Sequence, residues 1–167
     1  RVIDALNRHP EIHEIEIKKP IMIAGLPRSG TTHLLSMIAA DTRFRSMPYW
    51  ESKQPVPSPD EPVTHDTTDP RHVRCCEAYA GTDAMLPLMK NMHDMHPDHV
   101  QEDIELLDID FMSYVLEWMA HVPRWRDYYL AHDQTPHYGF LKTMLKVLSY
   151  YSGNGFGDES GGDLTPK

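Results

Sequence analysis

The sequence predicts one α/β domain, rich in helix, in which helices cover a parallel sheet. Two neighbouring observations carry this prediction. Residues 21–24 form a short apolar run between Pro20 and Gly25, which is typical of a strand buried on both faces of a parallel sheet. A glycine-bounded loop over 25–30 follows, and helical spacing of apolar residues then predicts a helix over 31–40.

Length and composition fit one globular domain and exclude several classes of protein. The chain has 167 residues, of which 25% are charged, and a formal net charge of −9. This net negative charge disfavours binding of nucleic acid over a broad surface, because the phosphate backbone is also negative. No apolar run approaches the roughly 18 residues of a membrane-spanning helix, so we expect no membrane segment. The two cysteines, Cys75 and Cys76, are adjacent and form no disulfide framework, which favours a reducing, cytoplasmic location.

The remaining elements are predicted to be helices and loops. Leu34, Leu35, Ile38 and Ala39 are the expected buried stripe of the 31–40 helix. Helical spacing predicts further helices over 1–9, 72–95 with a break near Pro87, 102–121, 125–131 and 135–151, and the proline-rich segment 54–70 is predicted to be a loop.

The loop between the expected strand and the 31–40 helix has the spacing of a phosphate-binding loop. It runs from Gly25 through Gly30 to Thr32 in the pattern G-x-x-x-x-G-x-[ST], which is the P-loop spacing. In such a loop, successive N–H groups and the positive end of the helix dipole point at one anion. The fold is therefore predicted to be of the P-loop type, with Ser29, Thr31 and Thr32 adding hydroxyl donors.

One position departs from the pattern of P-loop nucleoside triphosphatases. The lysine that should follow Gly30 is Thr31, and the positive charge is Arg28 instead. Hydrolysis of a triphosphate is thus poorly supported. A cradle for a single 5′-phosphate, with Arg28 beside a transferring group, fits the residues better.

The segment from Pro27 to Thr32, read Pro-Arg-Ser-Gly-Thr-Thr, resembles the 5′-phosphosulfate loop of sulfotransferases that use 3′-phosphoadenylyl sulfate. An arginine in this loop is similar to a bacterial-type branch of that family. Shorter segments also look like that branch, and they are Trp50–Glu51, Glu102–Leu107 and Asp133–Pro136. The resemblance covers about residues 12–151.

The resemblance implies a reaction and a set of site residues. A sulfuryl group would pass from 3′-phosphoadenylyl sulfate to a hydroxyl or amine of a small-molecule acceptor, without a metal. Arg28 would contact the 5′-phosphate and the departing sulfuryl oxygens, and Glu51 would be the general base. His33 is a second candidate for lining the site. The residues implied to bind the co-substrate are Pro27, Arg28, Ser29, Gly30, Thr31 and Thr32.

The end of the chain departs from the resemblance. Relatives of this kind continue with a second strand and with residues that hold the 3′-phosphate, whereas residues 152–167 are rich in glycine. We therefore expect residues 1–151 to be the N-terminal part of a C-terminally truncated domain, followed by a flexible and non-native tail. Weak co-substrate binding and an inactive fragment are both consistent with this interpretation.

Other functions stay open on the sequence. A P-loop nucleoside or nucleotide kinase shares the loop spacing, although Thr31 stands where its lysine should be. A non-catalytic helical interaction module would keep only the anion loop. His93, His96 and His99 have a spacing that permits metal binding, but Pro97 interrupts any helix there, so we expect no metal site.

Overall fold

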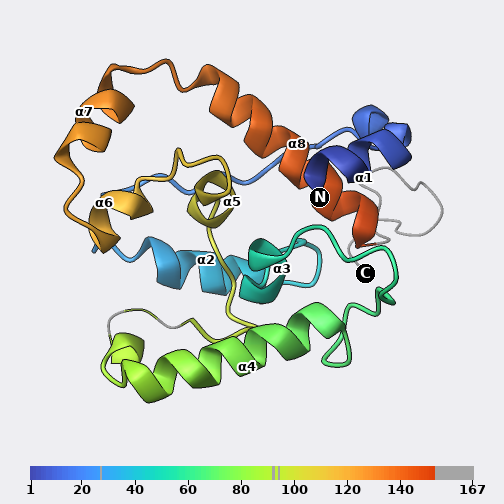
Figure 1. The fold of residues 1–167 in the computed structure, drawn as a ribbon, viewed down its shortest axis with the longest axis horizontal. Helices are drawn as coiled ribbons and strands as arrows, with labels where there is room; N and C mark the ends of the chain where they lie inside the picture. The colour runs from blue at the N-terminus through green and yellow to red at the C-terminus, as the bar shows by residue number, and fades with distance from the viewer. Residues whose placement is uncertain (27, 92, 94, 153–167) are drawn as a thin grey trace.

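The computed structural model describes residues 1–26, 28–91, 93 and 95–152. Helices dominate this part of the chain, and α8 crosses the molecule between α5 and α1 (Figure 1). In chain order the elements are α1 (Val2–Arg8), the 3-10 helix η1 (Pro10–Glu14), α2 (Thr31–Ala39), α3 (Tyr49–Lys53), α4 (Pro70–Met85), the 3-10 helix η2 (Met89–Asn91), α5 (Ile104–Asp108), α6 (Val115–Met119), α7 (Pro123–Ala131) and α8 (Thr135–Tyr151).

The core is built around α8, whose apolar side chains face two clusters. Leu141, Met144 and Leu148 pack with Met47 and with the leucines of α5. On another side of α8, Val147 packs with three residues from the N-terminal part and the proline-rich loop, which are Ala5, Ile12 and Val56. The predicted 135–151 helix is therefore confirmed, and Pro136 in its first turn, where a missing N–H costs nothing, explains its start.

Backbone hydrogen bonds hold α3 against the segment that enters α5. The N–H of Tyr49 donates to the carbonyl of His99 at 2.9 Å, and the N–H of Gln101 donates to the carbonyl of Met47 at 2.8 Å. Pro48 and Val100 form an isolated antiparallel bridge between the same two segments. This pairing places α3 and the start of α5 side by side although they are far apart in sequence.

The predicted buried strand over 21–24 is wrong. These residues have no regular secondary structure, and Ile21 and Met22 are 51% and 84% exposed. A strand satisfies its N–H and C=O groups only by pairing with a neighbour, and the residues described by the structure form no strand for it to pair with. The helix-rich character of the predicted fold is confirmed, and the parallel sheet is not observed in the described part.

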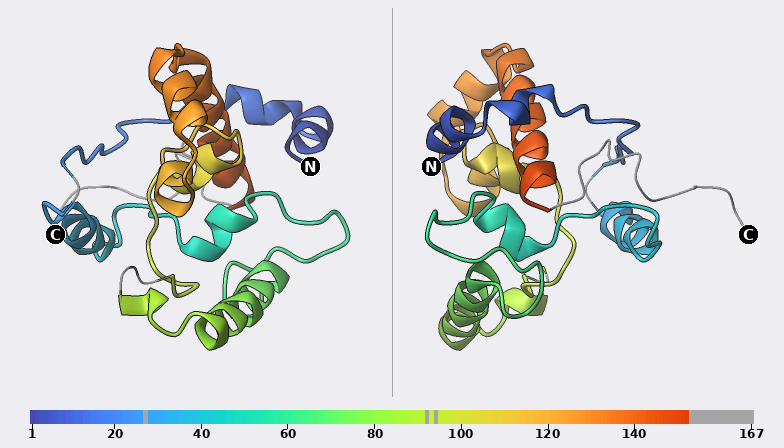
Figure 2. Two further views of the ribbon diagram at one scale, coloured as in Figure 1. Left: turned by 60° about the vertical axis from the view of Figure 1, so that its left-hand side comes forward. Right: turned by 90° about the vertical axis from the view of Figure 1, so that its right-hand side faces the viewer.

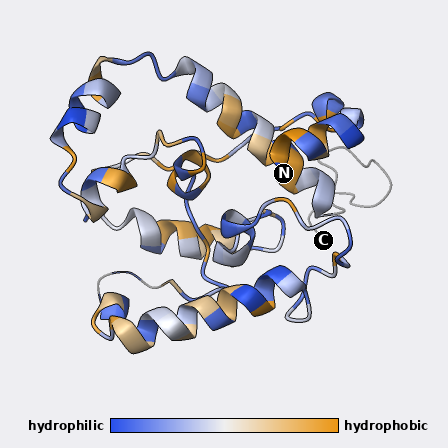
Figure 3. Ribbon diagram, viewed as in Figure 1, coloured by the Kyte–Doolittle hydropathy of each residue, from blue (hydrophilic) through white to orange (hydrophobic). Residues whose placement is uncertain are grey.

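The helix after the loop is confirmed as α2, but its predicted buried stripe is wrong. No residue of α2 is buried, and Leu34 is 47% exposed. Figure 2 shows α2 at the edge of the molecule in two further views, and Figure 3 shows its apolar residues in orange, away from the clusters around α8. The stripe has no apolar surface to cover because the sheet expected beside it is absent from the described residues.

The predicted single helix over 102–121 is also wrong, since the structure has two short helices, α5 and α6. The chain turns between them at Phe111, whose φ of 56° is left-handed, and the N–H of Met112 bonds back to the carbonyl of Leu107 at 3.1 Å. Of the apolar residues whose spacing predicted one helix, Leu106 and Leu107 are buried, whereas Phe111, Trp118 and Met119 are 74%, 59% and 66% exposed.

The other predicted elements agree with the structure. The 1–9, 72–95 and 125–131 helices correspond to α1, to α4 with a break before η2, and to α7, and the loop predicted over 54–70 lies between α3 and α4. Within the described segments, no helix combines the length and the apolar character needed to cross a bilayer. Of the predicted tail, residues 153–167 lie outside the described residues.

Candidate functional site

The loop before α2 is shaped by two residues in the left-handed region. Arg28 has a φ of 66°, and Gly30, the N-cap of α2, has a φ of 90°. The loop also folds back on its own start. A Cβ atom on Gly25 would lie 2.8 Å from Cγ2 of Thr31 and 2.9 Å from Oγ of Ser29, closer than side chains tolerate. Glycine at position 25 thus permits the tight curl that aims the loop at the first turn of α2.

The N-terminus of α2 is open to an anion. No side chain of the described residues caps it, and the first helical hydrogen bond runs from the N–H of Leu34 to the carbonyl of Gly30 at 3.0 Å. The N–H groups of Thr31, Thr32 and His33 therefore have no partner within the helix. Together with the positive end of the helix dipole, they form a site that favours a phosphate or sulfate.

Arg28 is the positive side chain of this site. It is exposed, and among the residues that the structure describes its guanidinium has no hydrogen-bond or ion-pair partner. A guanidinium two residues before the N-cap, together with the N–H groups of the first helical turn, suits a dianionic group better than a neutral one. The residues present thus fit the 5′-phosphosulfate end of the co-substrate that the sequence implied.

Of the predicted hydroxyl donors, Ser29 and Thr32 have other partners. Ser29 donates its hydroxyl to the carbonyl of Leu26 at 2.6 Å, and Thr32 donates to Oε1 of Glu102 at 3.4 Å. The backbone N–H groups of the first turn are therefore the donors that the structure leaves open to an anion, and the Ser29 hydroxyl instead stabilises the curl of the loop. Pro27 lies outside the described residues, and His33 is exposed.

Glu51, the predicted general base, is buried on α3. Its Oε2 atom lies 2.5 Å from Nη2 of Arg45 in an ion pair whose two side chains are 8% and 19% exposed. Nothing in the local sequence pattern signalled Arg45 as its partner. Among the described residues, no hydrogen bond or ion pair joins Glu51 to Arg28.

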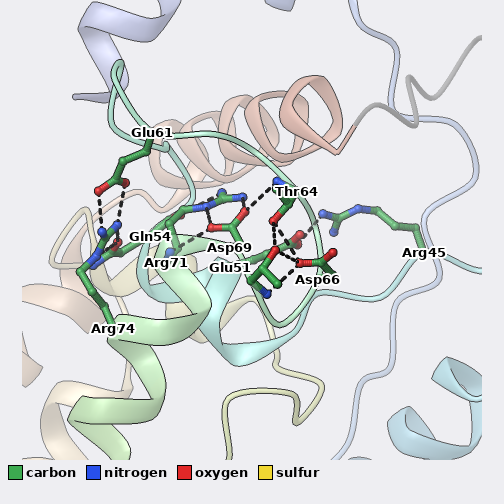
Figure 4. A network of polar contacts seen from close by, with 10 residues as sticks. Arg45, Glu51, Gln54, Glu61, Thr64, Asp66, Asp69, Arg71 and Arg74 are labelled. Carbon is green, nitrogen blue, oxygen red and sulfur yellow. Dashed lines mark hydrogen bonds and ion pairs between the residues drawn. The ribbon is translucent and has the colours of Figure 1, made fainter.

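A polar network fastens the proline-rich loop over α3 and α4 (Figure 4). Asp69 caps α4 through the N–H of Arg71, and its carboxylate forms a buried ion pair with the Arg71 guanidinium at 2.8 Å. Arg74 contacts both Gln54 and Glu61. Burial alone would raise the pKa of Asp69, but the hydrogen bonds from Arg71 outweigh it and lower the pKa to about 2.

Two acids at the start of α5 contact the two elements that carry the predicted site residues, α2 and α3. Glu102 accepts from Thr32 at the start of α2, and Glu105 forms an ion pair with Lys53 of α3 at 2.9 Å. The sequence singled out these acids only as members of the Glu102–Leu107 segment and predicted no contact for either of them. Their contacts span from 52 to 70 residues in sequence, so local spacing held no signal for them.

The structure offers no alternative centre for a metal among the residues it describes. Over 1–26, 28–91, 93 and 95–152, no group of three or more His, Cys, Asp or Glu side chains is arranged to hold an ion. An open pocket of about 360 Å³ lies between α6 and α7, lined by residues 117–123 and Arg126, and none of the predicted site residues lines it.

Comparison with known proteins gives a consistent result. The model of the sulfotransferase family matches residues 20–149. The sulfotransferase STF1 from Mycobacterium tuberculosis is similar in structure, with a TM-score of 0.75 and 26% identity, over 92% of this chain and 42% of that one. The sulfotransferase STF9 from Mycobacterium avium is similar with a TM-score of 0.71 and 25% identity, over 90% of this chain and 38% of that one. This chain thus spans about two fifths of the length of these two enzymes, and no curated protein matches it significantly.

Proposed function

This chain belongs to the sulfotransferase family, and on that premise we propose that its 25–32 loop binds the 5′-phosphosulfate end of 3′-phosphoadenylyl sulfate. The reaction proposed is transfer of a sulfuryl group to a hydroxyl or amine of a small acceptor. The chain spans 42% and 38% of the two similar enzymes. The proposal therefore covers only the part of the site that holds the 5′-phosphosulfate end of the co-substrate.

One observation carries this proposal, namely the N-terminus of α2, which no described side chain caps and whose N-cap, Gly30, follows Arg28 by two residues. When bound, the nucleotide supplies a sulfuryl group and a phosphate leaving group. The N–H groups of Thr31, Thr32 and His33 would hold the phosphate oxygens. Arg28 would stabilise the negative charge that develops on the bridging oxygen as the bond to sulfur breaks.

Glu51 is proposed to take the proton of the acceptor. A carboxylate does this work when it is held in a fixed position, and the ion pair with Arg45 fixes Glu51 within the buried part of α3. Arg45 is therefore proposed as a positioning residue. In this arrangement Arg28 acts on the leaving group and Glu51 on the acceptor, which are opposite sides of an in-line transfer.

Isothermal titration calorimetry with adenosine 3′,5′-bisphosphate tests the binding half of the proposal. We expect Arg28→Ala to weaken binding by about tenfold or more, because a charge-assisted hydrogen bond contributes about 1.5–3 kcal/mol. The matched control is Arg43→Ala, which removes the same charge beyond the other end of α2, where Arg43 pairs with Asp41 at 2.6 Å. This control should bind like the unmodified chain.

A parallel titration with ATP and Mg²⁺ separates the proposal from a P-loop kinase. A preference for ATP with Mg²⁺ would overturn the sulfotransferase assignment of the loop. Loss of binding in Arg43→Ala equal to that in Arg28→Ala would show that only net charge matters. If neither nucleotide bound the unmodified chain, the non-catalytic interaction module would be the better account.

A further inference from the structure

A second cluster of reactive side chains lies outside the proposed nucleotide site, with His72 and Cys76 on α4 and Asp98 in the segment before α5. Sγ of Cys76 lies 3.6 Å from Nδ1 of His72, one helical turn earlier, and Nε2 of His72 lies 2.9 Å from Oδ1 of Asp98. A thiol, an imidazole and a carboxylate are thereby joined in a row. This order of groups is the one in which a base abstracts the proton of a nucleophile while a third group orients the base.

The hydrogen bonds define the role of each nitrogen. An ionised carboxylate can only accept, so Nε2–H of His72 donates to Asp98 and Nδ1 is left to accept the proton of the Cys76 thiol. The ring is held firmly, because the His72 side chain is 8% exposed and packs edge-on against Trp50 at 6.0 Å between ring centres. Asp98 is 56% exposed and also faces His96, whose Nδ1 lies 3.8 Å from Oδ2.

The adjacent cysteine provides an internal comparison. Cys75 is buried, and burial, aided by the neighbouring Cys76, raises its pKa to about 11, with Lys53 and Asp98 as the other charged groups nearby. Cys76 is only partly buried and has the imidazole beside it. Two thiols one residue apart therefore differ in access and in the presence of a base.

We propose that Cys76 is a nucleophilic thiol, activated by His72 and positioned through Asp98, and that it is a site of covalent modification by small electrophiles. With an alkyl iodide, the thiol proton passes to Nδ1 of His72 and the sulfur forms a bond to carbon. The carbon–iodine bond breaks and iodide leaves with its electron pair. The imidazolium then returns its extra proton to water. No oxidant, metal or nucleotide takes part in this step.

Alkylation by iodoacetamide, located by peptide mass spectrometry, tests the proposal in the full chain. In a Cys75→Ser background, we expect Asp98→Asn and His72→Gln each to slow labelling of Cys76 at pH 7 by about tenfold, since few unassisted thiols are ionised at that pH. At about pH 10 the rates should converge, because an unassisted thiol is then ionised and access is unchanged. The matched control is Asp83→Asn, an acid on the same helix that pairs with Lys90, and its rate should equal the parent rate.

Equal rates at pH 7 in the parent and in Asp98→Asn would overturn the proposal. So would a slowing that persists undiminished at about pH 10, because that would mean altered access and not altered proton transfer. Asp98 is exposed enough that its substitution should leave the fold intact, which near-ultraviolet circular dichroism verifies. Should His72→Gln fail to fold, Asp98→Asn alone decides the outcome.

Discussion

At the start of α2, the absence of one Cβ atom allows the anion loop to close. Gly25 approaches Thr31 and Ser29 so nearly that a methyl group there would meet them at 2.8 Å and 2.9 Å. The loop spacing in the sequence predicted the positions of both loop glycines and the first residue of the helix, and it singled out Arg28 as the positive residue of the loop. It held no information on Arg45 as the partner of Glu51, nor on Glu102 as the partner of Thr32, since those contacts depend on how distant segments pack.

Substitution Gly25→Ala should distort the loop and weaken nucleotide binding. A Cβ atom this close to Cγ2 of Thr31 and Oγ of Ser29 requires those side chains or the loop to shift, so calorimetry with adenosine 3′,5′-bisphosphate should give a lower affinity. The control is Gly81→Ala in α4, where an added Cβ meets nothing within 4 Å. That change should raise the free energy of unfolding by about 0.5–1 kcal/mol and leave binding unchanged. Normal binding in Gly25→Ala would contradict the close approach.

At the scale of elements, the sequence predicts those helices that local signals delimit. Proline in the first turn and a continuous apolar stripe specify α8, whereas Asp69 and Pro70, which cap and begin α4, were predicted to lie in the 54–70 loop. The strand over 21–24 could not be predicted correctly, because its existence depends on a neighbouring strand and not on its own residues. The turn at Phe111 was hidden because the apolar residues on either side of it keep a helix-like spacing in the sequence, although Phe111, Trp118 and Met119 are exposed in the structure.

The start of α4 gives a prediction about pH. The pKa of Asp69 is lowered to about 2, so its ion pair with Arg71 stabilises the folded chain above the ordinary carboxyl range and loses this effect as pH falls from about 4 to about 2. Asp69→Asn should lower the free energy of unfolding at pH 7 by about 3 kcal/mol, because it leaves the Arg71 guanidinium buried and unpaired.

Urea denaturation of both proteins between pH 7 and pH 2.5 measures this effect. The difference in free energy of unfolding between the unmodified chain and Asp69→Asn should shrink toward the acid end. As a control, Asp60→Asn in the same loop removes an exposed carboxylate and should change stability by less than about 0.5 kcal/mol. A difference that stays constant down to pH 2.5 would show that the charge of Asp69 is not what stabilises α4.

At the scale of the molecule, stability and proposed function lie in different parts. The two apolar clusters meet on α8, while α2 and the loop before it lie at the edge and bury no residue of the helix (Figure 2). Segments with few buried apolar contacts open at a lower free energy than the core. The proposed anion site is therefore carried by a helix that buries no residue, as is also true of α6 and α7, and we expect a bound ligand to increase its local order.

Amide hydrogen exchange of the whole chain, with and without adenosine 3′,5′-bisphosphate, tests the central claim most directly. Without nucleotide, peptides from α2 should exchange much faster than peptides from α8. With saturating nucleotide, exchange should slow most over residues 28–39, since the N–H groups at the start of α2 would then donate to the phosphate. Unchanged exchange over 28–39, with slowing elsewhere in the chain, would contradict the claim that this loop binds the nucleotide.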